Sequence, residues 1–215
     1  MQEIEFKFQV PVKKRKALQK AFTLLKAEPI HLAAQYFDTA DQTLAKHCIA
    51  IRRRQENDEW KQTFKAVDTA KALGRFELEF DIEPPETTTL DLDNYKKDYS
   101  AIYKKLKRAL GLPLPTLELL FETKIQRLRV LQDVGSITVE IALDIGKIFK
   151  EQSSVDIFEI EFELKQGSIE DLIAFIQAWI QKYQLSLDTH SKSDYGLQAV
   201  RQQSSFSAQY QIPLV

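Results

Sequence analysis

The sequence predicts an α+β fold that is mainly β, an antiparallel sheet closed into a barrel with a charged interior and amphipathic helices packed outside. The first observation is a strict alternation of charged and apolar residues in several short segments, which is typical of strands that bury one face. The second is a set of three segments with apolar residues at helical spacing. The third is that the charged faces of these strands cannot form a conventional apolar core.

The first predicted strand begins within the first few residues. Residues 3–8 read Glu-Ile-Glu-Phe-Lys-Phe, so Glu3, Glu5 and Lys7 share one face of a strand and the apolar residues share the other. Glu3 and Glu5 then lie about 6.5–7 Å apart along the strand, given a rise of about 3.3 Å per residue. Like charges held that close repel unless a cation lies between them, which is a first indication of a metal site.

Three later segments, residues 75–80, 138–144 and 158–165, repeat the alternation with acidic residues on the charged face. In each segment the other face is large and apolar, so it has to be buried. The acidic residues presented in this way are Glu77, Glu79, Glu140, Asp144, Glu159, Glu161 and Glu163.

Basic residues follow the same pattern in segments of their own, at residues 51–54, 63–65 and 126–130, and an isolated lysine stands near the end of the chain. A solvated antiparallel sheet usually mixes both signs along each strand, because opposite charges are favoured across neighbouring strands. Segregation of the signs favours a charged face that surrounds something with both metal and phosphate character.

Three amphipathic helices are predicted over Val12–Glu28, Tyr95–Leu110 and Ser168–Tyr183. The last begins with a capping box, in which Asp171 follows Ser168 by three residues. The helices can cover the apolar face of the sheet, so the charged face lines the inside of a closed or nearly closed barrel without edge strands. The alternative is an open sheet whose charged face lies in solvent.

Length and composition set further limits. The 215 residues, 44% of them hydrophobic, suffice for one large domain, predicted over residues 1–200 with a C-terminal tail at 201–215. The net charge of −1 argues against nucleic-acid binding, and the single Cys48 fits a reducing compartment. Without a leader or an apolar run of the ~18–20 residues that cross a bilayer, the chain is expected to be cytoplasmic, with no membrane partner, as a monomer or homodimer.

The ordered set of motifs resembles the CYTH family, the triphosphate tunnel metalloenzymes, and looks most like its bacterial inorganic triphosphatase branch. Glu3-x-Glu5-x-Lys7 matches the ExExK signature of that family. The resemblance implies an eight-stranded antiparallel β-tunnel that binds a divalent metal ion and acts on triphosphates. The further matching segments are, in order, 36–39, 51–54, 63–65, 75–79, 140–144, 159–163 and 191–193.

The resemblance also gives the charged residues their expected roles. Triphosphate is a polyanion, for which arginine supplies bidentate donors and lysine a compact charge. The expected substrate-binding residues are Lys7, Arg52, Arg54, Lys65, Arg75, Arg127, Arg129 and Lys192. Mg²⁺ (or Mn²⁺) is expected on carboxylates, with water and phosphate oxygens completing its coordination. The expected metal ligands are Glu3, Glu5, Glu140, Asp144, Glu159 and Glu161, whereas Glu77 and Glu79 could equally serve as charge balance for neighbouring arginines.

Two routes to an activated water stay open. In one, Lys7 is the general base and Tyr36 orients the water, as has been proposed for members of the family. In the other, which we favour, a metal ion activates the water, Lys7 only binds phosphate, and Glu161 or Glu163 accepts the proton.

We therefore expect an enzyme, a metal-dependent triphosphatase that converts inorganic triphosphate to pyrophosphate and phosphate. The alternatives are a nucleoside or thiamine triphosphatase or a class IV-type adenylate cyclase of the same family, and a non-catalytic polyphosphate-binding module. The sequence contains no GxxxxGK[ST] or GxGxxG loop. Asp188, His190 and Ser191 superficially resemble triad residues, but neighbours in sequence do not make a triad.

Overall fold

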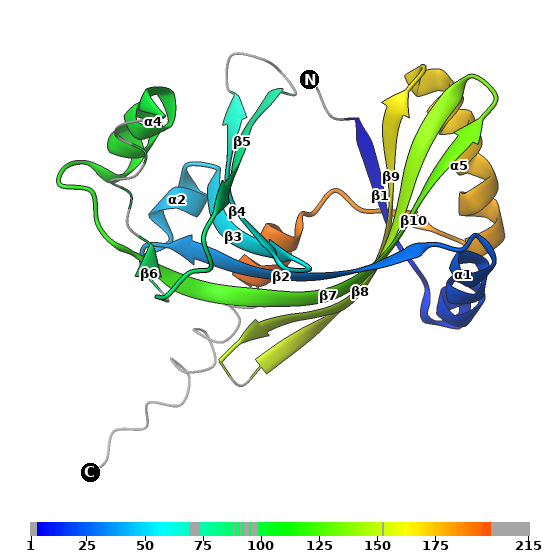
Figure 1. Cartoon of the computed structure of the whole chain (residues 1–215), viewed down its shortest axis with the longest axis horizontal. Coiled ribbons are helices and arrows are strands. Elements are labelled where there is room, and N and C mark those ends of the chain that lie inside the picture. Colours follow the sequence, from blue (N-terminus) through cyan, green and yellow to red (C-terminus); the bar gives the residue numbers. More distant parts are fainter. Residues whose placement is uncertain are drawn as a thin grey trace, which may run out of the picture. The chain divides into compact units, whose positions relative to one another are not determined.

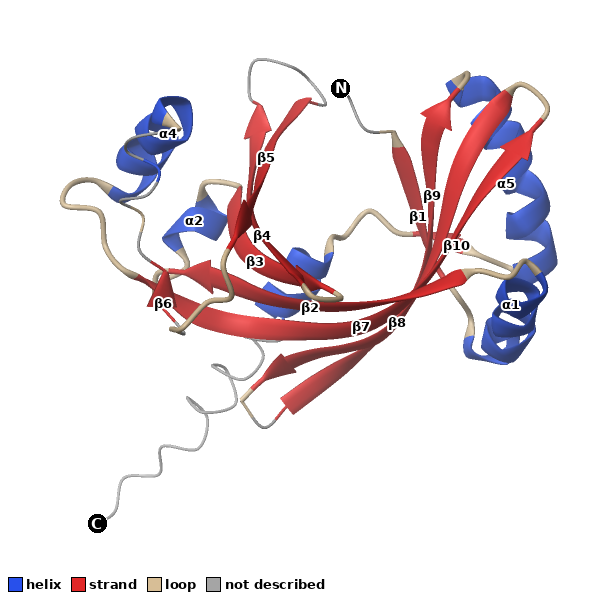
Figure 2. Cartoon of the chain, viewed as in Figure 1, coloured by secondary structure: helices blue, strands red, loops and turns tan. Residues whose placement is uncertain are grey.

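The computed structural model describes residues 4–68, 74–87, 89–90, 92, 95, 99–151 and 153–198. Strands predominate over helices (Figures 1 and 2). In chain order the elements are β1 (Glu5–Gln9), α1 (Val12–Leu24), β2 (Glu28–Asp38), α2 (Thr43–Lys46), β3 (Ile49–Glu56), β4 (Glu59–Asp68), β5 (Gly74–Ile82), β6 (Thr89–Leu90), α4 (Ser100–Leu110), β7 (Leu117–Val134), β8 (Ile137–Lys150), β9 (Ser153–Gln166), α5 (Ile169–Tyr183) and β10 (Ser186–Leu187). A further helical stretch covers residues 192–198.

The strands form a ten-stranded sheet with the order β10-β1-β9-β8-β7-β2-β3-β4-β5, and β6 pairs with β7. Neighbours such as β1 and β9, or β3 and β4, are antiparallel, which confirms the prediction of a mainly antiparallel α+β fold. Apart from β6 and β10, which have two residues each, eight strands make up the sheet. Among the described strands, hydrogen bonds do not close the sheet, because β10 and β5 end the order. The closed barrel therefore stays a prediction.

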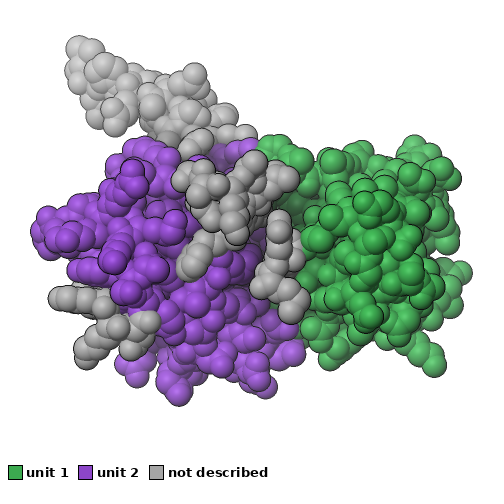
Figure 3. All heavy atoms as spheres, turned by 90° about the horizontal axis from the view of Figure 1, so that it is seen from above, with its two compact units in different colours: residues 1–32, 124–147, 155–191 green, residues 33–123, 148–154, 192–215 purple. Residues whose placement is uncertain are grey.

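The chain divides into two compact units (Figure 3). Unit 1 comprises residues 1–32, 124–147 and 155–191, and unit 2 comprises residues 33–123, 148–154 and 192–215. The long strands β2, β7, β8 and β9 contribute residues to both units. No helix in the described part of the chain is long and apolar enough to cross a membrane.

In unit 1, helices α1 and α5 cover the apolar face of the strands (Figure 1). Phe162 of β9 lies at the centre of this core and makes edge-on aromatic contacts with Phe8, Phe175 and Trp179, at ring-centroid distances of 5.9, 6.2 and 5.6 Å. Because strand side chains alternate between faces, the charged residues beside Phe162 lie on the face turned away from the helices. This arrangement agrees with the predicted packing of helices on the apolar face.

In unit 2, helix α4 packs on the apolar face of β3 and β4, where Ile102 and Leu106 join a core with Ile51 and Phe64. Tyr95 lies in the same core and accepts a hydrogen bond from Gln62 Nε2 over 2.7 Å. The charged residues of β3 and β4 again lie on the opposite face.

Among the three predicted helices, the clearest difference is the end of the first one. Helix α1 ends at Leu24 rather than at residue 28, because Lys26 turns the chain with φ 54° and the N–H of Ala27 returns to the carbonyl of Phe22. Helix α4 begins at Ser100; Tyr95, where the predicted helix begins, is also helical, and residues 96–98 lie outside the described ones. Helix α5 agrees with the prediction, and its cap is formed by Ser168 Oγ.

One strand was not predicted, and one predicted segment is not described by the structure. Strand β2 has no predicted counterpart, because its sequence EPIHLAAQYFD lacks a regular charged–apolar alternation. The predicted tail at 201–215 lies outside the described residues.

Candidate functional site

Three carboxylates of unit 1 converge on one face of the sheet. Asp144 extends from β8 and Glu159 and Glu161 from β9, and one oxygen of each lies within 4.8 Å of the others. The intervening residues Leu143 and Ile160 enter the apolar core on the other face. Asp144 is 0% exposed, Glu159 1% and Glu161 8%. Carboxylates buried this closely need cations beside them, since like charges disfavour ionisation.

Arg127 of β7 supplies one such cation. Its Nε donates to Asp144 Oδ1 over 2.7 Å and its Nη2 to Asp144 Oδ2 over 2.8 Å, and Nη2 also donates to Glu161 Oε2. Burial lowers the pKa of Arg127, but Asp144, Glu161 and Glu5 outweigh it and hold this pKa well above its usual value. The guanidinium therefore stays charged and forms a bidentate ion pair with Asp144.

Lys7 of β1 supplies a second cation. Its Nζ lies 3.5 Å from Glu159 Oε2 and 3.4 Å from Asp188 Oδ2, and it donates to the carbonyl of His190. Asp188 is buried and also accepts from Gln9 Nε2 over 2.6 Å and from the backbone N–H of His190 over 2.9 Å. Lys7 Nζ therefore lies between a backbone carbonyl and two carboxylates, which are groups that an amine contacts as a donor.

The carboxylate cluster fits a hard divalent cation. Mg²⁺ and ions like it prefer oxygen ligands and use carboxylates together with water and phosphate oxygens. Asp144, Glu159 and Glu161 offer three such oxygens close together. Arg127 and Lys7 use only some of the lone pairs, because each ionised carboxylate offers about four acceptor positions.

The other predicted acidic residues of unit 1 take different positions. Glu140 and Glu163 both pair with Lys165, at 3.5 and 2.6 Å, and are not members of the three-carboxylate cluster. Burial lowers the pKa of Lys165, but Glu163 and Glu140 outweigh it and raise this pKa above its usual value. Glu5 is exposed and acts on Arg127 through its charge. Glu3 lies outside the described residues.

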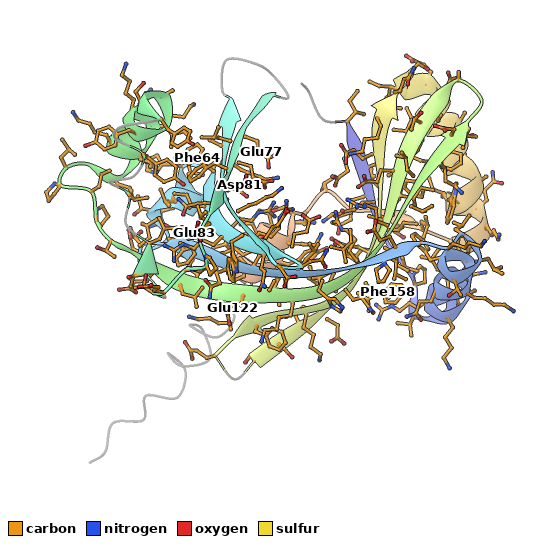
Figure 4. All side chains as sticks on the ribbon, in the orientation of Figure 1. Phe64, Glu77, Asp81, Glu83, Glu122 and Phe158 are labelled. Carbon is orange, nitrogen blue, oxygen red and sulfur yellow. The ribbon has the colours of Figure 1, made fainter. Side chains whose placement is uncertain are left out.

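Unit 2 presents a second charged face on β3, β4 and β5. The antiparallel register places residues of the three strands directly opposite one another in rows. Figure 4 shows Glu77 and Asp81 on the side of β5 turned away from α4, whereas Phe64 lies on the α4 side. The rows on the charged face are Ala50–Lys65–Glu77, Arg52–Thr63–Glu79 and Arg54–Lys61–Asp81.

A chain of hydrogen bonds links the two predicted arginines of this face. Arg52 Nη1 donates to the hydroxyl of Tyr36 over 3.5 Å, and Arg52 Nε donates to Thr63 Oγ1 over 3.3 Å. Thr63 Oγ1 donates to Glu79 Oε2 over 2.9 Å. Arg54 Nη2 donates to both oxygens of Glu79, over 3.3 and 3.2 Å. Sequence-distant residues from β2, β3, β4 and β5 thus form one network within unit 2.

The charges of this network stabilise one another. Burial lowers the pKa of Arg52, but Tyr36, Glu77 and Glu79 outweigh it and raise this pKa. Burial raises the pKa of Glu79, but Arg54, the hydrogen bond from Thr63, Arg52 and Lys61 outweigh it and lower this pKa. Glu79 is therefore a counter-ion of the arginines, which agrees with the charge-balance interpretation.

Two of the remaining predicted substrate-binding residues form ion pairs, and the other two are described only by their position in the chain. Lys65 pairs with Glu77 at 2.9 Å in unit 2, and Arg129 pairs with Glu28 at 3.0 Å in unit 1. Lys192, the isolated lysine near the end of the chain, begins the helical stretch 192–198, and its role in substrate binding stays a prediction. The side chain of Arg75 lies outside the described part of the chain.

Three residues at these clusters have no predicted role: Lys61, Thr63 and Asp188. The alternation Lys61-x-Thr63-x-Lys65 contained the signal for the first two, because it puts all three on one face of β4. Asp188 meets Lys7 where β10 pairs with β1, a contact between residues far apart in sequence that no local pattern could reveal.

Comparison with known proteins places these features in a family context. The family model described as the CYTH domain matches residues 1–195. The inorganic triphosphatase of Haemophilus influenzae is 30% identical over 202 residues, which are 91% of this chain and 54% of that protein, so the chain spans about half the length of this curated relative.

Two solved structures show the same fold at lower identity. A candidate adenylyl cyclase from Hippeastrum, with a dominant triphosphatase activity, has a TM-score of 0.63 at 18% identity, covering 92% of this chain and 96% of that chain. A candidate adenylate cyclase from Bacillus halodurans has a TM-score of 0.59 at 21% identity, covering 88% of this chain and 94% of that chain. At 18% and 21% identity, the two structures support the fold and not a function.

Proposed function

The chain belongs to the CYTH-domain family, and we propose that it is a divalent-metal-dependent triphosphatase that hydrolyses inorganic triphosphate to pyrophosphate and phosphate. The observation that carries the proposal is the buried cluster of Asp144, Glu159 and Glu161, with Arg127 bound to two of its members. Catalysis of phosphoryl transfer depends on positioning and electrostatic stabilisation rather than on covalent chemistry. A site for it therefore needs carboxylates that can hold a metal ion and permanent cations that can bind phosphate oxygens.

The curated relative supports the choice of substrate. The Haemophilus protein is an inorganic triphosphatase and is 30% identical over nearly the whole of this chain. Because the chain spans about half of the Haemophilus protein, we propose, on the basis of that similarity, that this chain acts on the same substrate. The match to the CYTH model over residues 1–195 likewise supports treating residues 1–200 as one domain, with the closed tunnel that the family resemblance implies.

Asp144, Glu159 and Glu161 are the residues that would hold Mg²⁺ or Mn²⁺. Such an ion, when bound, polarises phosphate oxygens and offsets their charge. Arg127 orients Asp144 through a charge-assisted bidentate pair and Glu161 through a single hydrogen bond. Lys7 places a compact positive charge 3.5 Å from Glu159 Oε2. The protein thus supplies an oriented, negatively charged set of oxygens together with cations that can accept phosphate oxygens.

The contacts of Lys7 favour its role as a cation over its role as a general base. A general base needs a lone pair, whereas Lys7 donates to a carbonyl and lies beside two carboxylates. Glu163 lies outside the three-carboxylate cluster, so it could accept a proton without giving up a metal-binding oxygen. We therefore propose Glu163, ahead of Glu161, as the proton acceptor.

Arg52 and Arg54 keep their predicted role in phosphate binding within this proposal. Both lie on the charged face of unit 2, in a hydrogen-bonded network that fixes their guanidinium groups. Arginine suits this role because its planar donors match phosphate oxygens in pairs.

Phosphate release tests the proposed function. The protein is given inorganic triphosphate, ATP or thiamine triphosphate, each with Mg²⁺, with Mn²⁺ and with EDTA, and Glu161→Gln serves as the inactive variant. The expected result is release from inorganic triphosphate that depends on metal and is lost in the variant.

Each alternative gives a different result in the same assay. Preference for ATP or thiamine triphosphate would favour another triphosphatase of the family, and formation of a cyclic nucleotide would favour a cyclase. Binding of triphosphate without phosphate release would favour a binding module. Undiminished turnover in EDTA would overturn the metal dependence.

A further inference from the structure

Thr63 lies in the middle row of the charged face of unit 2, and so far it has no role of its own in substrate binding. The register of β3, β4 and β5 places it directly between Arg52 on one side and Glu79 on the other. Its residue surface is 0% exposed, whereas Arg52 and Glu79 beside it are only partly buried. A neutral hydroxyl therefore separates a cation and an anion at a point where two ions could have met directly.

The hydroxyl of Thr63 links Arg52 and Glu79 by two hydrogen bonds, accepting one and donating the other. A hydroxyl has one donor and two acceptor lone pairs. Its hydrogen goes to Glu79 Oε2 over 2.9 Å, so a lone pair is available to accept from Arg52 Nε over 3.3 Å. With Arg52 Nη1 directed at the Tyr36 hydroxyl, two points of the guanidinium are fixed and its plane is determined.

Glu79 extends this fixed geometry to further cations. Both of its oxygens accept from Arg54 Nη2, and Lys61 Nζ lies 3.8 Å from Oε1. The carboxylate that Thr63 orients is therefore also the one that positions Arg54. One hydroxyl thus influences the two arginines proposed to bind phosphate.

Packing alone does not explain a threonine at this position. Valine has nearly the same shape and suits a central strand, whereas a buried hydroxyl is unfavourable unless it is hydrogen-bonded. A direct ion pair between Arg52 and Glu79 would also hold the arginine, but it would turn guanidinium donors toward the carboxylate. The hydroxyl keeps Arg52 oriented through its Nε, and the remaining N–H groups can then be offered to an anion.

We infer that Thr63 is a positioning residue for polyphosphate binding, whose hydroxyl orients Arg52 directly and Arg54 through Glu79, so that both present their donors to a triphosphate anion as one array. The identity of the anion rests on the proposed function. The positioning itself rests on the contacts of Thr63 within unit 2.

The test compares Thr63→Val, which removes the hydroxyl and keeps the shape, with Thr63→Ser, which keeps the hydroxyl. The Kd of inorganic triphosphate is measured by calorimetry, and KM and kcat are measured by phosphate release. Thr63→Val is expected to raise Kd and KM by about 10-fold or more, the scale of one hydrogen bond to a charged group, with a smaller change in kcat. Thr63→Ser is expected to stay within about threefold of wild type, because its hydroxyl can make both bonds.

A double-mutant cycle separates positioning from a merely structural role. In the Arg52→Ala background, Thr63→Val is expected to have a smaller effect on Kd than in the wild-type background, because the group that it orients directly is gone and only its effect on Arg54 through Glu79 remains. A Thr63→Val protein with a lower melting temperature but an unchanged Kd would overturn the inference. If Thr63→Val does not fold, Thr63→Ala, which brings no methyl group near the guanidinium, is measured in its place, and the same two outcomes decide.

The outcomes also keep the inference apart from the proposed function. Wild-type protein that binds triphosphate without hydrolysing it would refute the function, and the Kd comparison would still decide the role of Thr63. If the wild-type protein hydrolyses triphosphate and Thr63→Val has the same Kd and KM, the inference is refuted and the proposed function stands. Failure of wild-type protein to bind triphosphate would overturn both.

Discussion

Arg127 holds both carboxylate oxygens of Asp144, with its Nε and Nη2 donating over 2.7 and 2.8 Å. The Asp144 side chain is 0% exposed and the Arg127 side chain 20%, so the pair is largely removed from water, which has a free-energy cost that its attraction has to offset. A buried pair of this kind often stabilises a fold no better than apolar residues of similar size would. Its presence beside Glu159 and Glu161 is therefore better explained by what the cluster binds than by the stability of the sheet.

The first prediction concerns Asp144→Asn. Removing one charge of a buried pair takes away the bidentate partner of Arg127 and leaves it with Glu161 and the more distant charge of Glu5, so we expect the free energy of unfolding to fall by about 3 kcal/mol. We also expect Mg²⁺ or Mn²⁺ to raise the melting temperature of the wild-type protein but not that of the variant, because a ligand stabilises only the state that binds it. Chemical denaturation and thermal melting, with and without metal, measure both effects.

Asp156→Asn is the matched control for this prediction. Asp156 also pairs with a cation, Lys147 Nζ at 3.0 Å, but its side chain is 69% exposed. Exposed pairs contribute only about 0–1 kcal/mol, so this variant should unfold almost as the wild type does and keep its response to metal. Equal effects of the two substitutions would contradict the functional interpretation of the Asp144 cluster.

Much of the candidate site could be predicted because a period of two assigns side chains to faces. Alternation alone grouped Glu159 with Glu161 and Arg52 with Arg54, and the structure keeps each pair on one face. The choice of partners could not be predicted in this way, since it depends on strand register between distant segments. Lys7 contacts Asp188, and Arg127 contacts Asp144, only because β1, β7, β8, β9 and β10 pair as they do.

The second prediction concerns the cations of unit 2. Arg52→Ala and Arg54→Ala should each lower kcat/KM for inorganic triphosphate by about 100-fold or more, the effect of removing a preorganised charge that contacts the reacting group. Both side chains belong to the network around Glu79, so their loss removes oriented donors. Steady-state kinetics measures the change.

Arg108→Ala serves as the control, because Arg108 is an exposed arginine of α4 in the same unit. An exposed surface substitution should leave both stability and kinetics nearly unchanged. If Arg52→Ala and Arg54→Ala destabilise the fold but keep wild-type kcat/KM, the two arginines are structural and their role in substrate binding is wrong.

The third prediction concerns the alkaline stability of unit 2. Burial raises the pKa of Tyr95 to about 12, while the hydrogen bond from Gln62 and the charge of Arg53 lower it by less. An unfolded tyrosine loses its proton near pH 10, so between about pH 10 and 12 the unfolded chain binds fewer protons than the folded one. The stabilisation is therefore complete below about pH 10 and is lost as pH rises through the folded pKa.

Denaturation midpoints followed from pH 8 to 12 measure this loss. Tyr95→Phe cannot titrate, so its stability should decline less steeply over the same range. Its stability near neutral pH should be lower by about 1 kcal/mol, because the hydrogen bond with Gln62 is gone. Parallel alkaline curves for the two proteins would show that Tyr95 does not cause the decline.

The last prediction decides between the two roles of Lys7. Its Nζ donates to the carbonyl of His190 and lies 3.5 Å from Glu159 and 3.4 Å from Asp188, an arrangement that uses the donors of an ammonium group. Lys7→Arg keeps the charge but cannot act as a base, because arginine does not lose its proton in proteins. If Lys7 serves as a cation, this variant should keep a kcat near that of wild type.

The KM of Lys7→Arg should rise at the same time, since the larger planar guanidinium has to fit between Glu159 and Asp188. Lys7→Gln, which loses the charge, should impair both the binding of triphosphate and its turnover, and so shows that the position matters. The decisive comparison is therefore kcat against Kd in the arginine variant. Loss of kcat with triphosphate binding intact would mean that the proton passes to Lys7, because nothing else about the side chain's charge has changed, and Glu163 would then lose its place as the proton acceptor.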